Sequence, residues 1–229
     1  PDPDLSIYGW KQAAGGLGAV WAIENTREAI FDAMQRKETY ATTGSSIGVR
    51  FFGGYDFTEE DATLRLPADA GYKKGVPMGG NLSAAENGEK PTFLVAALKD
   101  PLSGNHDRIQ IVKGWVDGNG DTQERVYDVT WSGDRELDAE GKLPDVGKTV
   151  DVANATWTNT IGAGELIGVW EDPDFDPALK AFYYARVIEI PTPRWTAYEA
   201  KRFGVEMPDY VPMVTTERAY TSPIWYNPT

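Results

Sequence analysis

The chain has 229 residues, of which 41% are hydrophobic and 25% are charged, and it contains no cysteine. A chain of this length and composition can bury a substantial core, and the lack of cysteine excludes disulfides, thiolate catalysis and cysteine-based metal sites. Its 22 lysines and arginines stand against 35 aspartates and glutamates, a net charge of −13. We expect no nucleic-acid partner for such an acidic chain, and no membrane span without an apolar run of about 18 residues.

The chain opens with Pro1 and Asp2 rather than with methionine. We therefore expect a processed or truncated product of a longer protein, in which a signal peptide or a catalytic domain precedes residue 1. The lack of cysteine leaves the compartment open, and a periplasmic or secreted location is favoured over a cytoplasmic one.

The first predicted helix runs from about residue 26 to residue 37. Asn25 or Thr26 can cap its N-terminus, and Glu28 follows Asn25 at the spacing of a capping box. One face of this helix carries an apolar stripe at helical spacing, formed by Ala29, Ile30, Ala33 and Met34.

After this helix the apolar period changes to two, and Ile47, Val49 and Phe51 share one face of a predicted strand. Residues 56–81 are turn-rich and receive no assignment. A short helix is predicted near residues 196–203, ending at Gly204. Many short strands separated by turns predict a mainly β chain with an immunoglobulin-like β-sandwich. The further predicted strands cover residues 93–99, 108–116, 124–131, 149–152, 155–159, 165–170, 181–190 and 217–226.

The predicted hairpin turn after residue 116 contains Asp117, Asn119 and Asp121, whose spacing is that of oxygen ligands in calcium loops. The resemblance to a calcium loop is incomplete. Thr122 stands where such a loop needs glycine, and Asp128 stands in the predicted return strand where a bidentate glutamate is needed. A calcium site and a plain turn are both consistent with these residues, and turn chemistry alone explains them.

Two other polar segments are weaker candidates. Asp172, Asp174 and Asp176 could collect a metal ion, although Pro173 and Pro177 favour a rigid turn. The single histidine, at position 106, cannot build a histidine-rich metal cluster or a convincing catalytic triad, so we expect a solvated residue in a loop or turn.

Aromatic residues are abundant, with eight tryptophans and eleven tyrosines. They suggest a carbohydrate-binding face, but packing between sheets is the ordinary use of tryptophan in strands. Arg194 beside Trp195 indicates a cation–π contact that seats the second helix. The tryptophans expected in strands are Trp115, Trp131, Trp157 and Trp170.

Several long stretches, in the same order along almost the whole chain, resemble the carboxy-terminal part of the bacterial domain-of-unknown-function family 3604. They include the sequence AFYYARV from residue 181 and the sequence RAYTSPIWY from residue 218. The matching stretches are residues 17–34, 37–44, 49–54, 181–187, 190–195 and 217–226.

That family resembles the polymerase-and-histidinol-phosphatase (PHP) superfamily of metal-dependent hydrolases. The resemblance implies that residues 1–44 supply the last helix and strand of an upstream α/β barrel, and that residues 45–229 form an appended β-sandwich domain. None of the histidine motifs of the superfamily occurs in this chain, so no metal ligand can be assigned. A divalent metal is expected in the upstream barrel, and no cofactor in this chain.

Three functions follow as hypotheses. The first is a non-catalytic carboxy-terminal fragment of a PHP-like hydrolase, whose partner is the upstream barrel of the same protein. The second is a stand-alone module that binds a carbohydrate or another ligand through its aromatic residues. The third is a structural domain that stabilises the barrel or a homo-oligomer.

Overall fold

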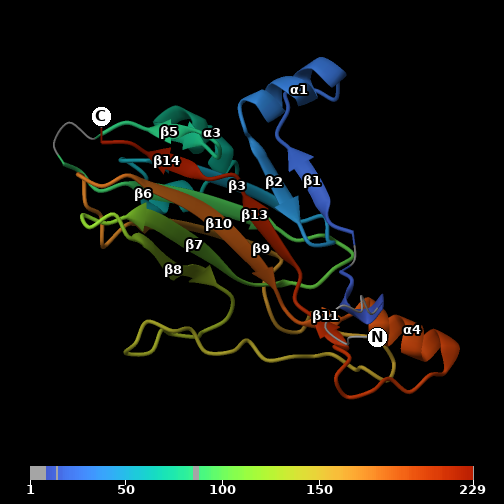
Figure 1. The fold of residues 1–229 in the computed structure, drawn as a ribbon. Helices are drawn as coiled ribbons and strands as arrows, with labels where there is room; N and C mark the ends of the chain where they lie inside the picture. The colour runs from blue at the N-terminus through green and yellow to red at the C-terminus, as the bar shows by residue number, and fades with distance from the viewer. Residues whose placement is uncertain (1–8, 14, 85–87, 229) are drawn as a thin grey trace.

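The computed structural model describes residues 9–13, 15–84 and 88–228. In this part of the chain, two largely antiparallel β-sheets pack face to face, and short helices lie at their margins (Figure 1). The prediction of a mainly β chain is confirmed. None of the described helices is long and apolar enough to cross a membrane.

The larger sheet is organised around the central strand β10 (Ala181–Glu189). Strand β7 pairs along one side of β10, while β13 and β14 pair with the two halves of its other side. The pairing of β14 with β5 is parallel, and the other pairings between the described strands of this sheet are antiparallel. Its other strands are β1 (Leu17–Val20), β2 (Thr39–Thr42), β5 (Asn81–Leu82), β7 (His106–Val116), β8 (Thr122–Trp131), β13 (Arg218–Thr221) and β14 (Ile224–Tyr226).

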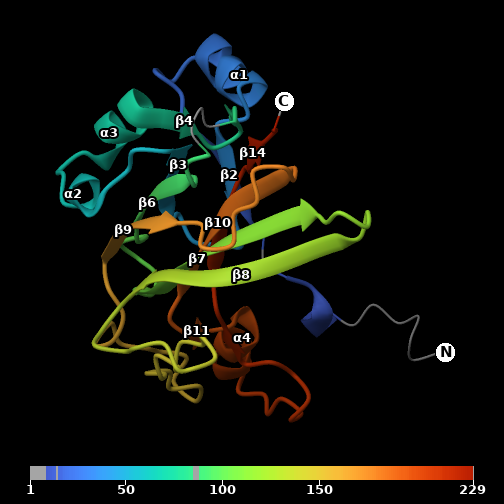
Figure 2. The ribbon, with the colours of Figure 1, turned by 90° about the vertical axis from the view of Figure 1, so that its left-hand side faces the viewer.

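The smaller sheet has the order β4, β3, β6, β9, and two helices cover its outer face (Figure 2). Phe52 of β3 points to this outer face, away from the neighbouring core residue Phe51. A Cβ at Gly71 would lie 2.4 Å from Phe52 Cδ2, so glycine permits the close approach of the helix. These elements are β3 (Gly48–Gly54), β4 (Gly75–Pro77), β6 (Thr92–Leu98), β9 (Glu165–Glu171), α2 (Glu59–Ala62) and α3 (Pro67–Lys74).

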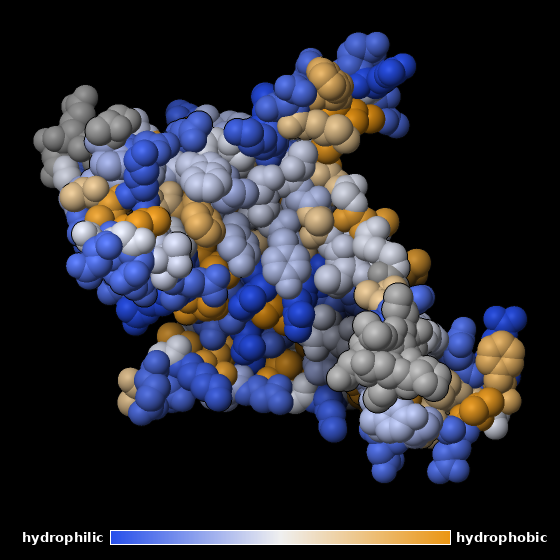
Figure 3. All heavy atoms as spheres, in the orientation of Figure 1, coloured by the Kyte–Doolittle hydropathy of each residue, from blue (hydrophilic) through white to orange (hydrophobic). Residues whose placement is uncertain are grey.

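Two parts of the chain stand away from the sheets at separate corners (Figures 1 and 3). One is α1 (Arg27–Gln35), between β1 and β2, and the other is α4 (Trp195–Phe203) beside the ribbon of β11 (Thr192–Pro193) and β12 (Val214–Thr215). A short 3-10 helix (Gly9–Lys11) precedes Gln12, whose carbonyl accepts hydrogen bonds from Arg194 Nη2 at 2.7 Å and Trp195 Nε1 at 3.2 Å.

Both predicted helices are present, within one or two residues of their expected bounds. Thr26 caps α1, because its Oγ1 accepts a hydrogen bond from the backbone N–H of Ala29 at 3.3 Å. Helix α4 ends at Gly204, whose φ of 62° lies in the left-handed region that glycine adopts without strain. The guanidinium of Arg194 lies 5.1 Å from the ring of Trp195, as the predicted cation–π contact requires.

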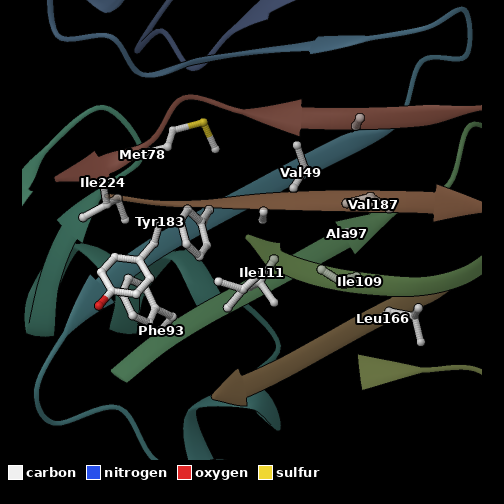
Figure 4. Close-up of a cluster of buried hydrophobic side chains, with 14 of the residues drawn as sticks. Val49, Met78, Phe93, Ala97, Ile109, Ile111, Leu166, Tyr183, Val187 and Ile224 are labelled. Carbon is white, nitrogen blue, oxygen red and sulfur yellow. The ribbon is translucent and has the colours of Figure 1, made fainter. Parts of the chain in front are cut away.

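The main core lies between the two sheets, and both contribute side chains to it (Figure 4). Ile47, Val49 and Phe51 all point into it, which confirms the predicted period of two. Trp115 and Trp170 pack against its edge. Strand β6 of the smaller sheet adds Phe93 and Val95, and the facing residues of the larger sheet come from β7 and β10, among them Ile109, Ile111, Tyr183 and Val187.

The predicted strands at residues 149–152 and 155–159 are absent, and an isolated bridge between Asp151 and Thr156 stands in their place. Asp151 accepts hydrogen bonds from the backbone N–H of Asn154 at 3.1 Å and from its Nδ2 at 2.7 Å. Such local side-chain hydrogen bonds compete with the backbone hydrogen bonds that would pair two β-strands. Trp157 therefore lies in a loop and not in a strand.

The segment assigned by resemblance to an upstream barrel is joined to the larger sheet. Strand β2 pairs with β13, with Thr42 opposite Ala219. Trp21 Nε1 also donates a hydrogen bond to the carbonyl of Val49 in β3 at 2.8 Å. The barrel itself, which is expected before residue 1, stays a prediction.

Candidate functional site

A groove with a volume of about 610 Å³ lies at one end of the larger sheet. It is formed where the ends of β7, β8, β10 and β14 meet, and its volume is in the range of small-molecule sites. We call it the aromatic groove. Its apolar lining consists of Gly114, Trp115, Val116, Ala181, Phe182, Trp225 and Tyr226, and its polar lining of Thr122, Gln123, Glu124, Lys180 and Asn227.

Phe182 and Trp225 point away from the core into this groove. Successive side chains of a strand alternate between its two faces, and the neighbours Tyr183 and Ile224 are both core residues. The ring centroids of Phe182 and Trp225 lie 5.3 Å apart at an interplanar angle of 49°. Trp225 is 43% exposed, which leaves much of its ring available to a ligand.

The ring of Phe182 lies over the backbone of Gly114. These two residues are opposite each other in the ladder between β10 and β7. A Cβ at position 114 would come within 2.3 Å of Phe182 Cζ, so only glycine leaves room for the ring in this position. Glu124 of β8 is opposite Gly114 on its other side. The floor of the aromatic groove is therefore a flat ring beside a carboxylate.

The polar lining can donate and accept hydrogen bonds. Gln123 Nε2 is already held by Asp117 Oδ2 at 2.9 Å. Lys180 carries the positive charge of the lining and Glu124 the negative charge, so the formal charges cancel. A flat aromatic floor with such a margin suits a neutral ligand that has one apolar face and several hydroxyl or amide groups.

A second, charged cavity of about 410 Å³ lies between the base of α1 and the sheets. At its centre is the buried carboxylate of Glu38, 3.4 Å from Arg36 Nη2 and 3.7 Å from Arg50 Nη1. The hydroxyl of Tyr72 donates a hydrogen bond to Glu38, and burial together with this carboxylate raises the pKa of Tyr72. The guanidinium carbon of Arg50 lies 3.4 Å from the ring centroid of Trp21. The cluster holds two guanidinium groups around one carboxylate, and these contacts join the end of α1 to β3 and α3.

The outward face of α1 carries apolar side chains with little cover. Ala29 and Ala33 are buried, but Phe31 is 58% and Met34 is 54% exposed. Ile23, in the segment before the helix, is 93% exposed. The α4 corner has exposed apolar side chains as well, namely Tyr198, Phe203, Val205 and Tyr210.

The three candidate calcium ligands lie in the turn between β7 and β8. Asp117 Oδ1 accepts hydrogen bonds from the backbone N–H groups of Asn119 at 2.9 Å and Asp121 at 3.0 Å. These bonds hold the pKa of the Asp117 carboxyl below its usual value. Within the described ranges no group of three or more histidine, cysteine, aspartate or glutamate residues could hold a metal ion. Calcium binding by this turn stays a prediction.

The aspartates near residue 174 have separate partners. Asp172 is fully buried, with Lys113 Nζ at 2.6 Å and the donating hydroxyl of Tyr183 at 2.7 Å. Asp174 lies at the surface and pairs with Arg125 at 2.6 Å. The third member, at position 176, accepts a hydrogen bond from the backbone N–H of residue 178 at 2.9 Å. Their oxygens are thus engaged in stabilising the turn and the core.

The expectation of a solvated histidine is wrong. His106 is fully buried as the first residue of β7, and its backbone N–H donates to the carbonyl of Ala163 at 2.8 Å. Burial lowers the pKa of its imidazole to about 4. Glu189, opposite His106 in the ladder, is also fully buried and accepts a hydrogen bond from Ser103 Oγ at 2.6 Å. Burial raises the pKa of Glu189. Both groups are enclosed, away from any substrate.

Packing against the core, the ordinary use expected for tryptophan in strands, is observed for Trp115 and Trp170, and Trp115 also lines the aromatic groove. The rings that line the outer face are Phe182 and Trp225. The sequence does contain a signal for Phe182, because AFYYARV places aromatic residues on both faces of a strand.

Comparison with curated proteins and with solved structures finds no match to this chain. A family model, in contrast, matches residues 3–228, which is nearly the whole chain. The chain therefore belongs to the family described as Protein of unknown function (DUF3604).

Proposed function

We propose that this chain is the non-catalytic carboxy-terminal domain of a PHP-like, metal-dependent hydrolase, and that α1 and α4 hold the preceding catalytic barrel. In this proposal the two-sheet core is a sandwich of the immunoglobulin-like type. The observation that supports it is the exposure of apolar side chains on α1 and α4, which stand at separate corners, above and below the sheets in the views of Figures 1 and 2.

The energetic argument rests on the outward face of α1. Burial of a phenylalanine or methionine side chain contributes about 1.5–3 kcal/mol relative to exposure. In this chain alone, Phe31, Met34 and Ile23 are largely exposed and do not contribute most of this burial energy. A contiguous apolar surface of this kind marks an interaction site.

The position of the N-terminal residues supports the proposal that the apolar corners are covered by a preceding part of the same chain. The described segment around Gln12 lies beside α4, to which Arg194 and Trp195 attach it. A domain that precedes this segment would start close to one of the two apolar corners. The described residues gather no metal-ligand set, so in this proposal the barrel holds the divalent metal with its own residues, and no reaction step is assigned to this chain.

The test uses a longer chain that includes the residues encoded before Pro1. We expect it to purify with a bound divalent metal, measured by mass spectrometry of the elements. We also expect the amide hydrogens of α1 to exchange more slowly in the longer chain than in residues 1–229 alone. An upstream sequence without a histidine- and aspartate-rich barrel, or equal exchange of α1 in both chains, would contradict the proposal.

A matched pair of variants identifies the docking face. Phe31→Asp in the longer chain should expose the barrel to limited proteolysis, because it places a charge in the interface. Leu64→Asp is the control, since Leu64 is an exposed apolar residue between α2 and α3, outside α1 and α4. If light scattering shows that residues 1–229 form a dimer that Phe31→Asp dissociates, a second copy covers α1 and barrel docking is refuted.

A further inference from the structure

We propose that the aromatic groove binds a neutral saccharide, whose sugar ring stacks on Trp225 and Phe182 while its hydroxyl groups bond to the polar lining. This site is separate from the docking corners of the proposed function. The strand end that supplies Trp225 lies on the side of the C-terminus, away from α4 (Figure 1).

The rings provide the surface that a sugar needs. A pyranose has an apolar face of C–H groups and an edge of hydroxyl groups, so it matches a flat aromatic surface with polar groups around it. Phe182 is held flat because it lies over Gly114, and Trp225 is held against Phe182 at 5.3 Å. Both rings belong to paired strands, so little conformational freedom is lost when a ligand binds.

The polar groups favour hydroxyl groups over a charged ligand. The Glu124 carboxylate can accept bonds from two neighbouring hydroxyls, and the Asn227 amide can both donate and accept. The charges of Glu124 and Lys180 cancel within the groove, and the chain as a whole carries −13. This field repels sulfated or carboxylated polysaccharides and leaves neutral saccharides as the matching class.

The binding test follows the tryptophan side chains directly. The chain has eight tryptophans, and the indole N–H signal of Trp225 in a nitrogen–proton correlation spectrum is identified by its loss in Trp225→Phe. The probes are hexasaccharides of β-linked glucose, α-linked glucose, xylose and N-acetylglucosamine. We expect at least one of them to shift the Trp225 signal in a saturable way, with the signal of Trp170, which packs against the core outside the groove, less affected.

Two variants and one control test the assignment of the groove. Trp225→Ala should weaken the binding of the responsive hexasaccharide by about tenfold or more, as for the central aromatic residue of an interface. Glu124→Gln should weaken binding less, because the amide retains one acceptor. Phe203→Ala, which removes a still more exposed ring at the α4 corner, should change affinity by less than about twofold.

The outcomes separate this proposal from barrel docking. Absence of a saturable shift with all four hexasaccharides at millimolar concentration would overturn it, and so would equal weakening by Trp225→Ala and Phe203→Ala. Circular dichroism melting of each variant shows whether its fold is intact, and Trp225→Phe replaces Trp225→Ala if the latter unfolds. Neither overturning result affects the metal content or the exchange of α1 in the longer chain.

Discussion

Protonation of His106 is expected to destabilise the folded chain in mild acid. His106 is fully buried, and burial lowers its pKa from 6.5 to about 4. Between these values the unfolded chain binds a proton that the folded chain does not. Stability therefore rises with pH from about 4 to about 6.5 and falls on acidification through the same window.

The size of the effect follows from the two pKa values. One pKa unit corresponds to about 1.4 kcal/mol, so a shift of this size predicts a loss of about 2 kcal/mol at pH ~5 and about 3 kcal/mol at pH ~4, relative to neutral pH. Glu189 and Asp107 act in the opposite direction, because burial raises the pKa of each carboxyl. The contribution of His106 must therefore be measured as a difference between two proteins.

The comparison is between the wild-type chain and His106→Leu, each unfolded by urea at several pH values. The variant retains the carboxyl groups, so the difference in the free energy of unfolding isolates the imidazole. The proton spectrum gives a second measurement, since one histidine produces one titrating imidazole signal. A folded-state pKa near 6.5, or a difference between the two proteins that does not change with pH, would refute the buried position of His106.

Two further substitutions test the core and a helix end, both by urea unfolding. Lys113→Met should lower the free energy of unfolding by about 3–5 kcal/mol, because it removes the cation that lies 2.6 Å from the buried carboxylate of Asp172. The double variant Lys113→Met with Asp172→Leu should recover most of this loss, since no buried charge is left. A loss below about 1 kcal/mol for the single variant would contradict the buried ion pair. Gly204→Ala should cost about 1 kcal/mol because Gly204 has a φ of 62°, whereas an unchanged stability would mean that α4 ends differently.

The β architecture could be predicted because its signals are local. The alternation of Ile47, Val49 and Phe51 identifies a strand and also the face that enters the core. The turn at Asp117 joins two strands that pair directly, with Val116 opposite Thr122. In both cases the residues that determine the structure are close in sequence, and no distant segment is needed to interpret them.

The two helices over the smaller sheet could not be recognised in this way. Helix α2 is one turn long, and α3 contains Gly71, which lowers its intrinsic helix propensity. Helix α3 packs on Phe52, which is distant in sequence and whose outward direction is known only once β3 is in place. Helix α2 is tied to α3 by the ion pair of Asp61 with Lys74 at 2.7 Å. Tertiary packing overrides a weak local preference at this point.

The aromatic groove depends on pairings that no local pattern specifies. Phe182 and Trp225 become neighbours because β14 pairs with one half of β10, while β13 pairs with the other half. Gly114 matters only because β7 places it under the ring of Phe182. A glycine in a strand signals that something approaches the backbone closely, but the sequence does not say what. Its partner here is an aromatic ring on the outer face of the sheet, and this contact is defined only once β7 and β10 are paired.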